Sequence, residues 1–145
     1  MATTTPNFGW TVPTSSDLVK NGATAIETLG DSVDASFAGL TVNAQTGTTY
    51  TAVKADGLNA IVTMDNASAN TFSIPTDATY AFPTGTTLLV YQKGAGVTTI
   101  QAASSGTTTV VSAGAVLAAP VLARYKSAAC IKIAANSWIV VGAVA

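Results

Sequence analysis

Residues 14–40 are the stretch of this chain with helical periodicity, and they constrain the fold more than any other feature. The apolar positions that repeat along this stretch are Val19, Ile26, Leu29, Val33 and Leu40. Four of them lie seven residues apart, and Leu29 falls between two of these. Such spacing places an apolar seam along one side of a helix, as in helices that pack against copies of themselves. The sequence therefore predicts an oligomerising helix over residues 14–40.

This helix should be weak by itself, because Gly22 and Gly30 each cost about 1 kcal/mol relative to alanine. Thr14 and Asp17 have the spacing of a capping box at its start, and Gly39 is a plausible end. The seam must be buried for the helix to persist. Two interpretations are open: the helix folds back on its own strand domain, or several chains form a short bundle. The narrow seven-residue strip favours the bundle.

Residues 1–13 form an N-terminal arm, in which two prolines and a glycine are expected to prevent regular structure. The residues of interest in the arm are Phe8, Trp10, Val12 and Pro13. The large rings of Phe8 and Trp10 are costly to leave in water. Either they staple the start of the helix onto its own domain, or they anchor the arm in a groove of a partner protein.

Residues 41–47 are expected to be a polar hinge, and residues 48–145 a β-domain. Apolar and β-branched runs separated by turn residues predict strands at Thr48–Val53, Ala60–Met64, Thr71–Ile74, Thr87–Gln92, Val97–Gln101, Thr107–Ser112, Val121–Lys126, Ala129–Ala134 and Ser137–Ala143. Short strands at this spacing are typical of an antiparallel β-sandwich or barrel. The predicted fold class is thus mainly β, with an N-terminal arm and one α-helix in a short trimeric bundle before the β-domain.

Two features of the β-domain suggest that other subunits cover part of it. Thirty residues between Lys93 and Arg124 carry no charge, although sheets usually place charges on their solvent-facing side and edges. A threonine-rich polar surface is the alternative explanation. Residues 138–141 are apolar on both faces, which is typical of a strand that is central in its sheet or covered by another subunit. Alternation also predicts that Ile131 and Ile133 face one side of their strand and Cys130 and Lys132 the other.

The chain lacks the residues on which most enzyme sites depend. It has no histidine and one cysteine, Cys130, so neither a Cys/His metal cluster nor a histidine-activated nucleophile can form. Gly94-Ala95-Gly96 precedes a predicted strand and is therefore expected to be a turn rather than a phosphate-binding loop. The net charge of −1 and the absence of a long apolar run argue against nucleic-acid and membrane partners. We expect a non-enzymatic protein with no catalytic or metal-binding residues and no cofactor.

Two stretches of the chain resemble segments of known proteins. Residues 9–31, GWTVPTSSDLVKNGATAIETLGD, resemble the N-terminal segment of many virion proteins of tailed bacteriophages. Residues 45–51, QTGTTYT, are similar to the opening of a β-domain found in phage fibre-like proteins, whose pattern continues through FPTGT (residues 82–86), GAGVT (94–98) and WIVVG (138–142). The resemblance implies a virion protein that forms a homotrimer, with an arm fixed to the particle, a three-helix bundle and projecting β-domains.

The resemblance and the short chain together favour a capsid decoration or head-fibre protein, a minor capsid protein whose arm binds the major capsid protein or another virion protein. A tail-associated fibre or receptor-binding protein is the alternative, in which Tyr80, Tyr91 or Tyr125 would stack on a host-surface glycan. The seam pattern alone, with β-branched residues at one position and leucine at the other, favours dimers in long parallel coils. The trimer is what the resemblance implies.

Overall fold

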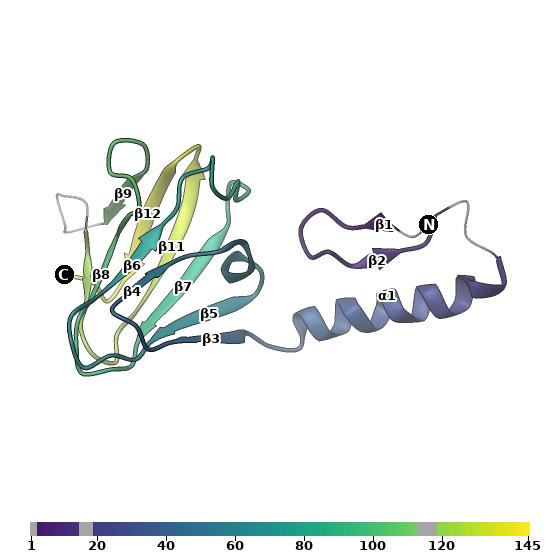
Figure 1. The fold of residues 1–145 in the computed structure, drawn as a ribbon, viewed down its shortest axis with the longest axis horizontal. Helices are drawn as coiled ribbons and strands as arrows, with labels where there is room; N and C mark the ends of the chain where they lie inside the picture. Colours follow the sequence, from purple (N-terminus) through teal and green to yellow (C-terminus); the bar gives the residue numbers. More distant parts are fainter. Residues whose placement is uncertain (1–2, 15–18, 113–118) are drawn as a thin grey trace. The chain divides into compact units, whose positions relative to one another are not determined.

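The structure, a computed structural model, describes residues 3–14, 19–112 and 119–145. The chain divides into two compact units, residues 1–40 and residues 41–145 (Figure 1). The described residues are mainly β, with one α-helix in the N-terminal unit, which confirms the prediction of a mainly β chain with one helix before a β-domain. The boundary after residue 40 coincides with the predicted end of the helical segment.

The arm is a small β-hairpin and not an irregular segment, so the expectation for residues 1–13 was wrong. Strand β1 (Thr3–Thr4) pairs antiparallel with β2 (Thr11–Val12). The loop between them closes through two backbone hydrogen bonds of Thr5, one to the Trp10 carbonyl at 2.9 Å and one from the Gly9 amide at 3.0 Å. Gly9 has a φ of +69°, a conformation that glycine adopts without a steric penalty. The proline and glycine therefore shape the hairpin loop instead of preventing the hairpin.

The helix is shorter than predicted. A 3₁₀ turn, η1 (Val19–Asn21), leads into α1 (Gly22–Phe37), so the helix does not extend over residues 14–40. Asp17 of the predicted capping box lies outside the described residues. At about 1.5 Å per residue, α1 is about 24 Å long.

Hydroxyl side chains follow one line along α1. Thr28, Ser32 and Ser36 each donate a hydrogen bond of 2.8 Å to the backbone carbonyl four residues earlier. These bonds occupy hydroxyl groups that would otherwise compete with helix formation. Poor helix formers are therefore accommodated in α1.

The β-domain contains two sheets of described strands (Figure 1). The six-stranded sheet has the order β3 (Thr41–Gln45), β5 (Ala60–Met64), β7 (Thr87–Gln92), β11 (Ser127–Ala134), β12 (Ser137–Gly142) and β9 (Thr109–Ser112). The four-stranded sheet has the order β10 (Val121–Leu122), β8 (Thr98–Ala102), β6 (Asn70–Ile74) and β4 (Thr49–Thr51). A short 3₁₀ helix, η2 (Lys54–Gly57), follows β4.

The predicted hinge at residues 41–47 was wrong, because residues 41–45 form strand β3 at an edge of the six-stranded sheet. This strand pairs in parallel with β5. The sequence TVNAQ contains no long apolar run. This edge strand was therefore interpreted as part of a polar hinge. Three residues, 38–40, connect α1 to β3.

The predicted antiparallel arrangement was also wrong. From β3 to β8 the chain alternates between the two sheets, so that β3, β5 and β7 lie in one sheet and β4, β6 and β8 in the other. Strands that follow each other within a sheet are therefore parallel, as in β3–β5–β7 and β4–β6–β8. Antiparallel pairs occur later in the chain, for example between β11 and β12. The spacing of strands along the sequence is the same in a parallel and an antiparallel arrangement. It therefore does not show which sheet each strand joins.

The core lies between the inner faces of the two sheets. Its largest fully buried side chains are Trp138, Phe72, Met64, Ile74, Leu88, Ile100 and Leu122. The alternation in β11 is as predicted, and the face that carries Cys130 and Lys132 is the buried one. Ile131 is half-buried and Ile133 exposed. Residues 138–141 lie in β12, between β11 and β9, with Trp138 and Val140 in the core.

Candidate functional site

An exposed apolar stripe runs along the N-terminal unit. Among the predicted seam residues, Val19 is 96% exposed, Ile26 66% and Leu40 47%, and Phe37 on the same side is 70% exposed. Leu29 and Val33 are half-buried. At about 100° per residue, Ile26, Val33 and Phe37 lie within one narrow sector of α1. We call Val19, Ile26, Val33, Phe37 and Leu40 the apolar stripe.

The acidic residues of α1 lie away from this stripe. Glu27, Asp31 and Asp34 are all exposed, and at about 100° per residue they lie on the flank of the helix about 60–140° from Ile26 and Phe37. The helix thus has separate apolar and acidic faces, and charge does not interrupt the stripe.

The hairpin packs on a third face of α1. The rings of Phe8 and Trp10 stack with centroids 4.8 Å apart and planes at 21°, and Phe8 also lies 6.4 Å from the ring of Phe37. The indole Nε1 of Trp10 donates a hydrogen bond of 3.1 Å to the hydroxyl of Ser36. These contacts pack the arm onto its own helix, whereas the stapling interpretation expected the two rings to fix the start of the helix onto its own domain. The contacts are made near the end of α1 and not at its start.

The arm residues Val12, Pro13 and Phe8 are all at least partly exposed. Val12 is half-buried in β2, and Pro13 is exposed beside the helix. Phe8 remains 37% exposed although it stacks on Trp10. The arm therefore presents a pre-formed aromatic surface rather than an extended peptide.

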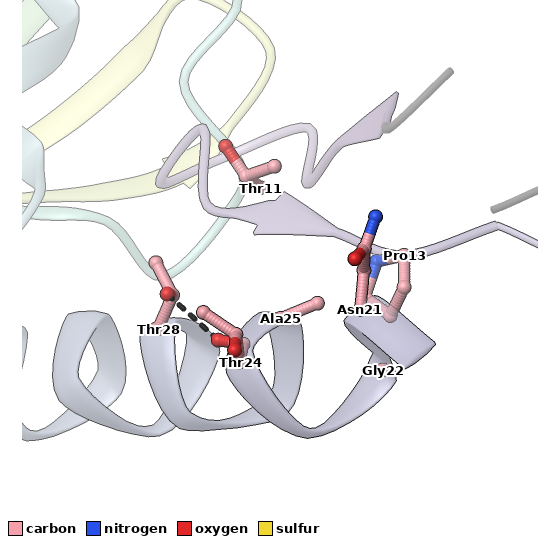
Figure 2. Close-up of a pocket in the computed structure, with 7 residues that line it drawn as sticks. All are labelled: Thr11, Pro13, Asn21, Gly22, Thr24, Ala25 and Thr28. Atoms are coloured by element: carbon pink, nitrogen blue, oxygen red, sulfur yellow. Dashed lines mark hydrogen bonds between the residues drawn. The ribbon is translucent and has the colours of Figure 1, made fainter. Parts of the chain in front are cut away.

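A groove of about 360 Å³ lies between the hairpin and the first turns of α1 (Figure 2). It is lined by Thr11, Pro13, Asn21, Gly22, Thr24, Ala25 and Thr28. Figure 2 shows the hydroxyl of Thr28 bonded to the carbonyl of Thr24, so this hydroxyl is already engaged within the helix. The lining has no charged side chain and no acid–base group. It is suited to an apolar side chain rather than to an ion or a reacting substrate.

Asp56 is buried in the β-domain and has a full set of partners. Its carboxylate accepts hydrogen bonds from the Asn43 amide at 2.7 Å, the Tyr50 hydroxyl at 2.8 Å and the Val53 backbone amide at 2.8 Å. Burial raises the pKa of Tyr50 to about 12, and the hydrogen bond to Asp56 and the charge of Asp56 add to this rise. The cluster ties β3, β4 and η2 together. Three hydrogen bonds from within the fold account for this buried carboxylate as a structural group.

Lys132 is a second buried charged group, and sequence reasoning did not identify its partner. It is 4% exposed and lies 2.6 Å from an Asp77 carboxylate oxygen, and its ammonium also donates to the Phe82 carbonyl at 2.6 Å. The other Asp77 oxygen accepts the Asn136 backbone amide at 3.1 Å. Because Asp77 and Lys132 are 55 residues apart in sequence, no local signal could have found this pair.

The other sequence-derived candidates are not drawn together into a catalytic or metal site. Within residues 3–14, 19–112 and 119–145, no group of three or more His, Cys, Asp or Glu side chains is placed to hold a metal ion. Gly94-Ala95-Gly96 forms a turn after β7, as predicted, and a Cβ at Gly96 would lie 2.0 Å from the Ser68 carbonyl oxygen. This glycine permits two backbone segments to approach closely.

The three candidate tyrosines have different surroundings. Tyr80 packs against the core beside Phe82, with ring centroids 6.3 Å apart, and Tyr91 is half-buried in β7. Tyr125 is 61% exposed, and the Arg124 guanidinium lies 4.5 Å from its ring centroid. Tyr125 is therefore the one of the three with substantial surface available for stacking.

None of the described helices is long and apolar enough to cross a membrane. Comparison of the chain with protein-family models, with curated proteins and with solved structures gives no match.

Proposed function

We propose that this chain is a non-enzymatic structural protein of a tailed-bacteriophage virion, assembled as a homotrimer through α1. The observation that supports this most is the apolar stripe, of which Val19, Ile26, Phe37 and Leu40 are exposed in the single chain. The resemblance of residues 9–31 and 45–145 to phage virion proteins supplies the kind of assembly and its location. A capsid decoration or head fibre is the specific role we favour.

Burial of the stripe is worth enough to hold helices together. A fully buried large apolar side chain contributes about 1.5–3 kcal/mol relative to an exposed one. The stripe has three members that are at least 60% exposed, namely Val19, Ile26 and Phe37. Association of three helices would therefore gain several kcal/mol per chain, and it would offset the weak intrinsic stability of α1.

The proposed attachment surface is the exposed side of the hairpin, centred on Phe8. In the bound state this surface would contact the major capsid protein or another virion protein. A rigid aromatic pair loses little conformational freedom on binding, and such residues are enriched among those that dominate binding energy. The packing of Trp10 on Ser36 would keep Phe8 in position for the contact.

The oligomer is tested by mass photometry and sedimentation of the full-length chain at micromolar concentration. We expect a trimer for the unaltered protein, and a monomer for Ile26→Asp, because the new carboxylate would lie within the buried stripe. Ala35→Asp, on the exposed opposite side of α1, is the matched control and should remain trimeric. A stable monomer for the unaltered chain, or an Ile26→Asp protein that still forms trimers, would contradict the proposed assembly.

Virion location is tested on purified particles of the phage that encodes the chain. Mass spectrometry should find the protein in many copies, and electron microscopy of labelled particles should place it on the head. Phe8→Asp should reduce rebinding to particles that lack the protein, while the turn variant Asn7→Asp should bind normally. Absence from particles would rule out the virion role, and full occupancy by Phe8→Asp trimers would rule out the attachment surface.

Exposure of Tyr125 favours one alternative, a tail-associated fibre or receptor-binding protein that contacts a host glycan. One ring face already lies under Arg124, which leaves the other for a sugar. In this case labelled particles should carry the protein in few copies at the tail, and Tyr125→Ala should reduce binding to host cells. Head labelling with unchanged cell binding would exclude this alternative.

A further inference from the structure

The outer face of the six-stranded sheet is apolar along a continuous row. Strand register aligns one residue from each of five neighbouring strands, which are Val42, Ile61, Leu89, Ala129 and Val141. A second row beside it contains Ile131, Ile139 and Val111. Val42, Val111 and Val141 are each more than 40% exposed. None of the outward-facing residues in the six described strands of this sheet is charged.

This face is also slightly hollow. A depression of about 350 Å³ lies over the middle of the apolar row and is lined in part by Ile61, Leu89, Ala129 and Val141. Its lining contains no charged group and no cluster of hydrogen-bonding side chains. The depression can accept apolar side chains from a facing surface.

The four-stranded sheet provides an internal comparison. Its outward-facing residues are Thr49, Thr51, Thr71, Ser73, Thr99, Gln101 and Val121. Hydroxyl and amide groups predominate there, as is usual for a sheet face in contact with water. The two outer faces belong to the same domain, and β-branched residues make up more than half of each, so β-propensity does not explain why they are mostly Val and Ile on one face and mostly Thr on the other. The apolar face has the composition of a surface that is covered.

We infer that the outer face of the six-stranded sheet is a second subunit interface, covered by the β-domain of another copy of this chain. The inference rests on the self-association proposed above. It extends the oligomer contact from the helix to the projecting domains.

Size argues for a second copy rather than an independent partner. Five strand spacings of about 4.8 Å and five residues of about 3.3 Å give a face of roughly 400 Å². A stable interface between independent proteins buries about 800 Å² on each partner. This face is therefore too small to hold a separate protein by itself, but it is large enough to associate when its partner is tethered.

The short connection between the two units provides such a tether. Residues 38–40 alone separate the end of α1 from the start of β3. Helices that associate through the apolar stripe would hold their β-domains at an effective concentration in the millimolar range. At this concentration a small uncharged apolar face is sufficient for association, and no complementary charge is required.

The test measures how fast an introduced cysteine reacts with a maleimide reagent in the native full-length protein. Val141→Cys reports on the apolar face and Thr71→Cys on the polar face of the other sheet. Cys130 is 0% exposed and should contribute no background. In the oligomer we expect Val141→Cys to react about tenfold or more slowly than Thr71→Cys, because reaction requires local separation of the domains. Adding Ile26→Asp should make the two rates equal.

Each other result overturns the inference in a distinguishable way. Rapid reaction of Val141→Cys in a stable trimer would exclude this interface and leave the proposed trimer intact. Protection that persists in the Ile26→Asp monomer would show that the same chain covers the face. Protection that appears on particles but not in the free trimer would assign the face to another virion protein. A monomeric unaltered chain would remove both the proposed function and the inference.

Discussion

The buried pair of Lys132 and Asp77 makes a sharp prediction about the stability of the β-domain. Asp77→Ala removes the carboxylate and leaves the ammonium of Lys132, which is 4% exposed, with the Phe82 carbonyl as its remaining described partner. Removing one partner of a buried ion pair costs about 3–5 kcal/mol, since the other charge stays buried without compensation. This is a large part of the roughly 5–15 kcal/mol by which a domain of this size is stable.

Lys132→Met should cost less than Asp77→Ala. Methionine fills a similar volume without a charge, and the Asp77 side chain, 25% exposed, keeps water and the Asn136 amide as partners. The main loss is the donor to the Phe82 carbonyl, which is worth about 1–3 kcal/mol. Asp77→Ala should therefore be less stable than Lys132→Met by about 2 kcal/mol.

Urea unfolding followed by circular dichroism measures this difference. With a typical slope of about 2 kcal/mol per molar, the midpoint of Asp77→Ala should lie about 1 M below that of Lys132→Met. All proteins must be compared at one concentration, because association also stabilises the folded state. If Lys132→Met proves as unstable as Asp77→Ala or more so, burial of the uncompensated charge is not what makes the pair important.

Three further predictions concern single positions in the β-domain. Gly96→Ala should lower the melting temperature strongly, because its Cβ would lie 2.0 Å from a backbone oxygen. Gly106→Ala is the control and should have little effect, since no atom lies within 4 Å of its Cβ. Thermal unfolding of the two variants measures the difference. The pKa of Tyr50 is raised to about 12, so its contribution to stability should be present below pH 10 and lost between about pH 10 and 12. In urea unfolding, Tyr50→Phe should lose less free energy of unfolding over that range than the unaltered protein. Burial raises the pKa of the Cys130 thiol to about 12, so this thiol should not react with a disulfide reagent at pH 8 until the protein is unfolded. Rapid reaction of the native protein would contradict its buried position.

Local patterns were sufficient to predict many elements of the fold. Strands β5 and β7 have the predicted bounds, since each is an alternating or apolar run between turn residues. Strand β3 was missed because its polar sequence becomes a strand through pairing with β5. The parallel arrangement was missed because it depends on which sheet each successive strand joins. The spacing of strands along the sequence carries no information on this.

The candidate interaction surfaces were predicted in part. Heptad spacing identified Val19, Ile26 and Leu40, which the structure leaves exposed. It could not predict that Leu29 would be half-buried in a unit whose hairpin packs on α1. The aromatic residues of the arm suggested a contact, and their position near Ser36 depends on how the hairpin folds back.

The sequence by itself determined that this chain is mainly β, that one amphipathic helix precedes the strands, and that charge is scarce. These properties follow from residue type and spacing, which act over a few neighbouring positions. Tertiary structure decided which side of each strand became the core. The alternation in β11 assigns its residues to two faces but does not show which face is buried. Lys132 points inward and Ile131 outward, because Asp77 from a distant segment compensates the buried charge.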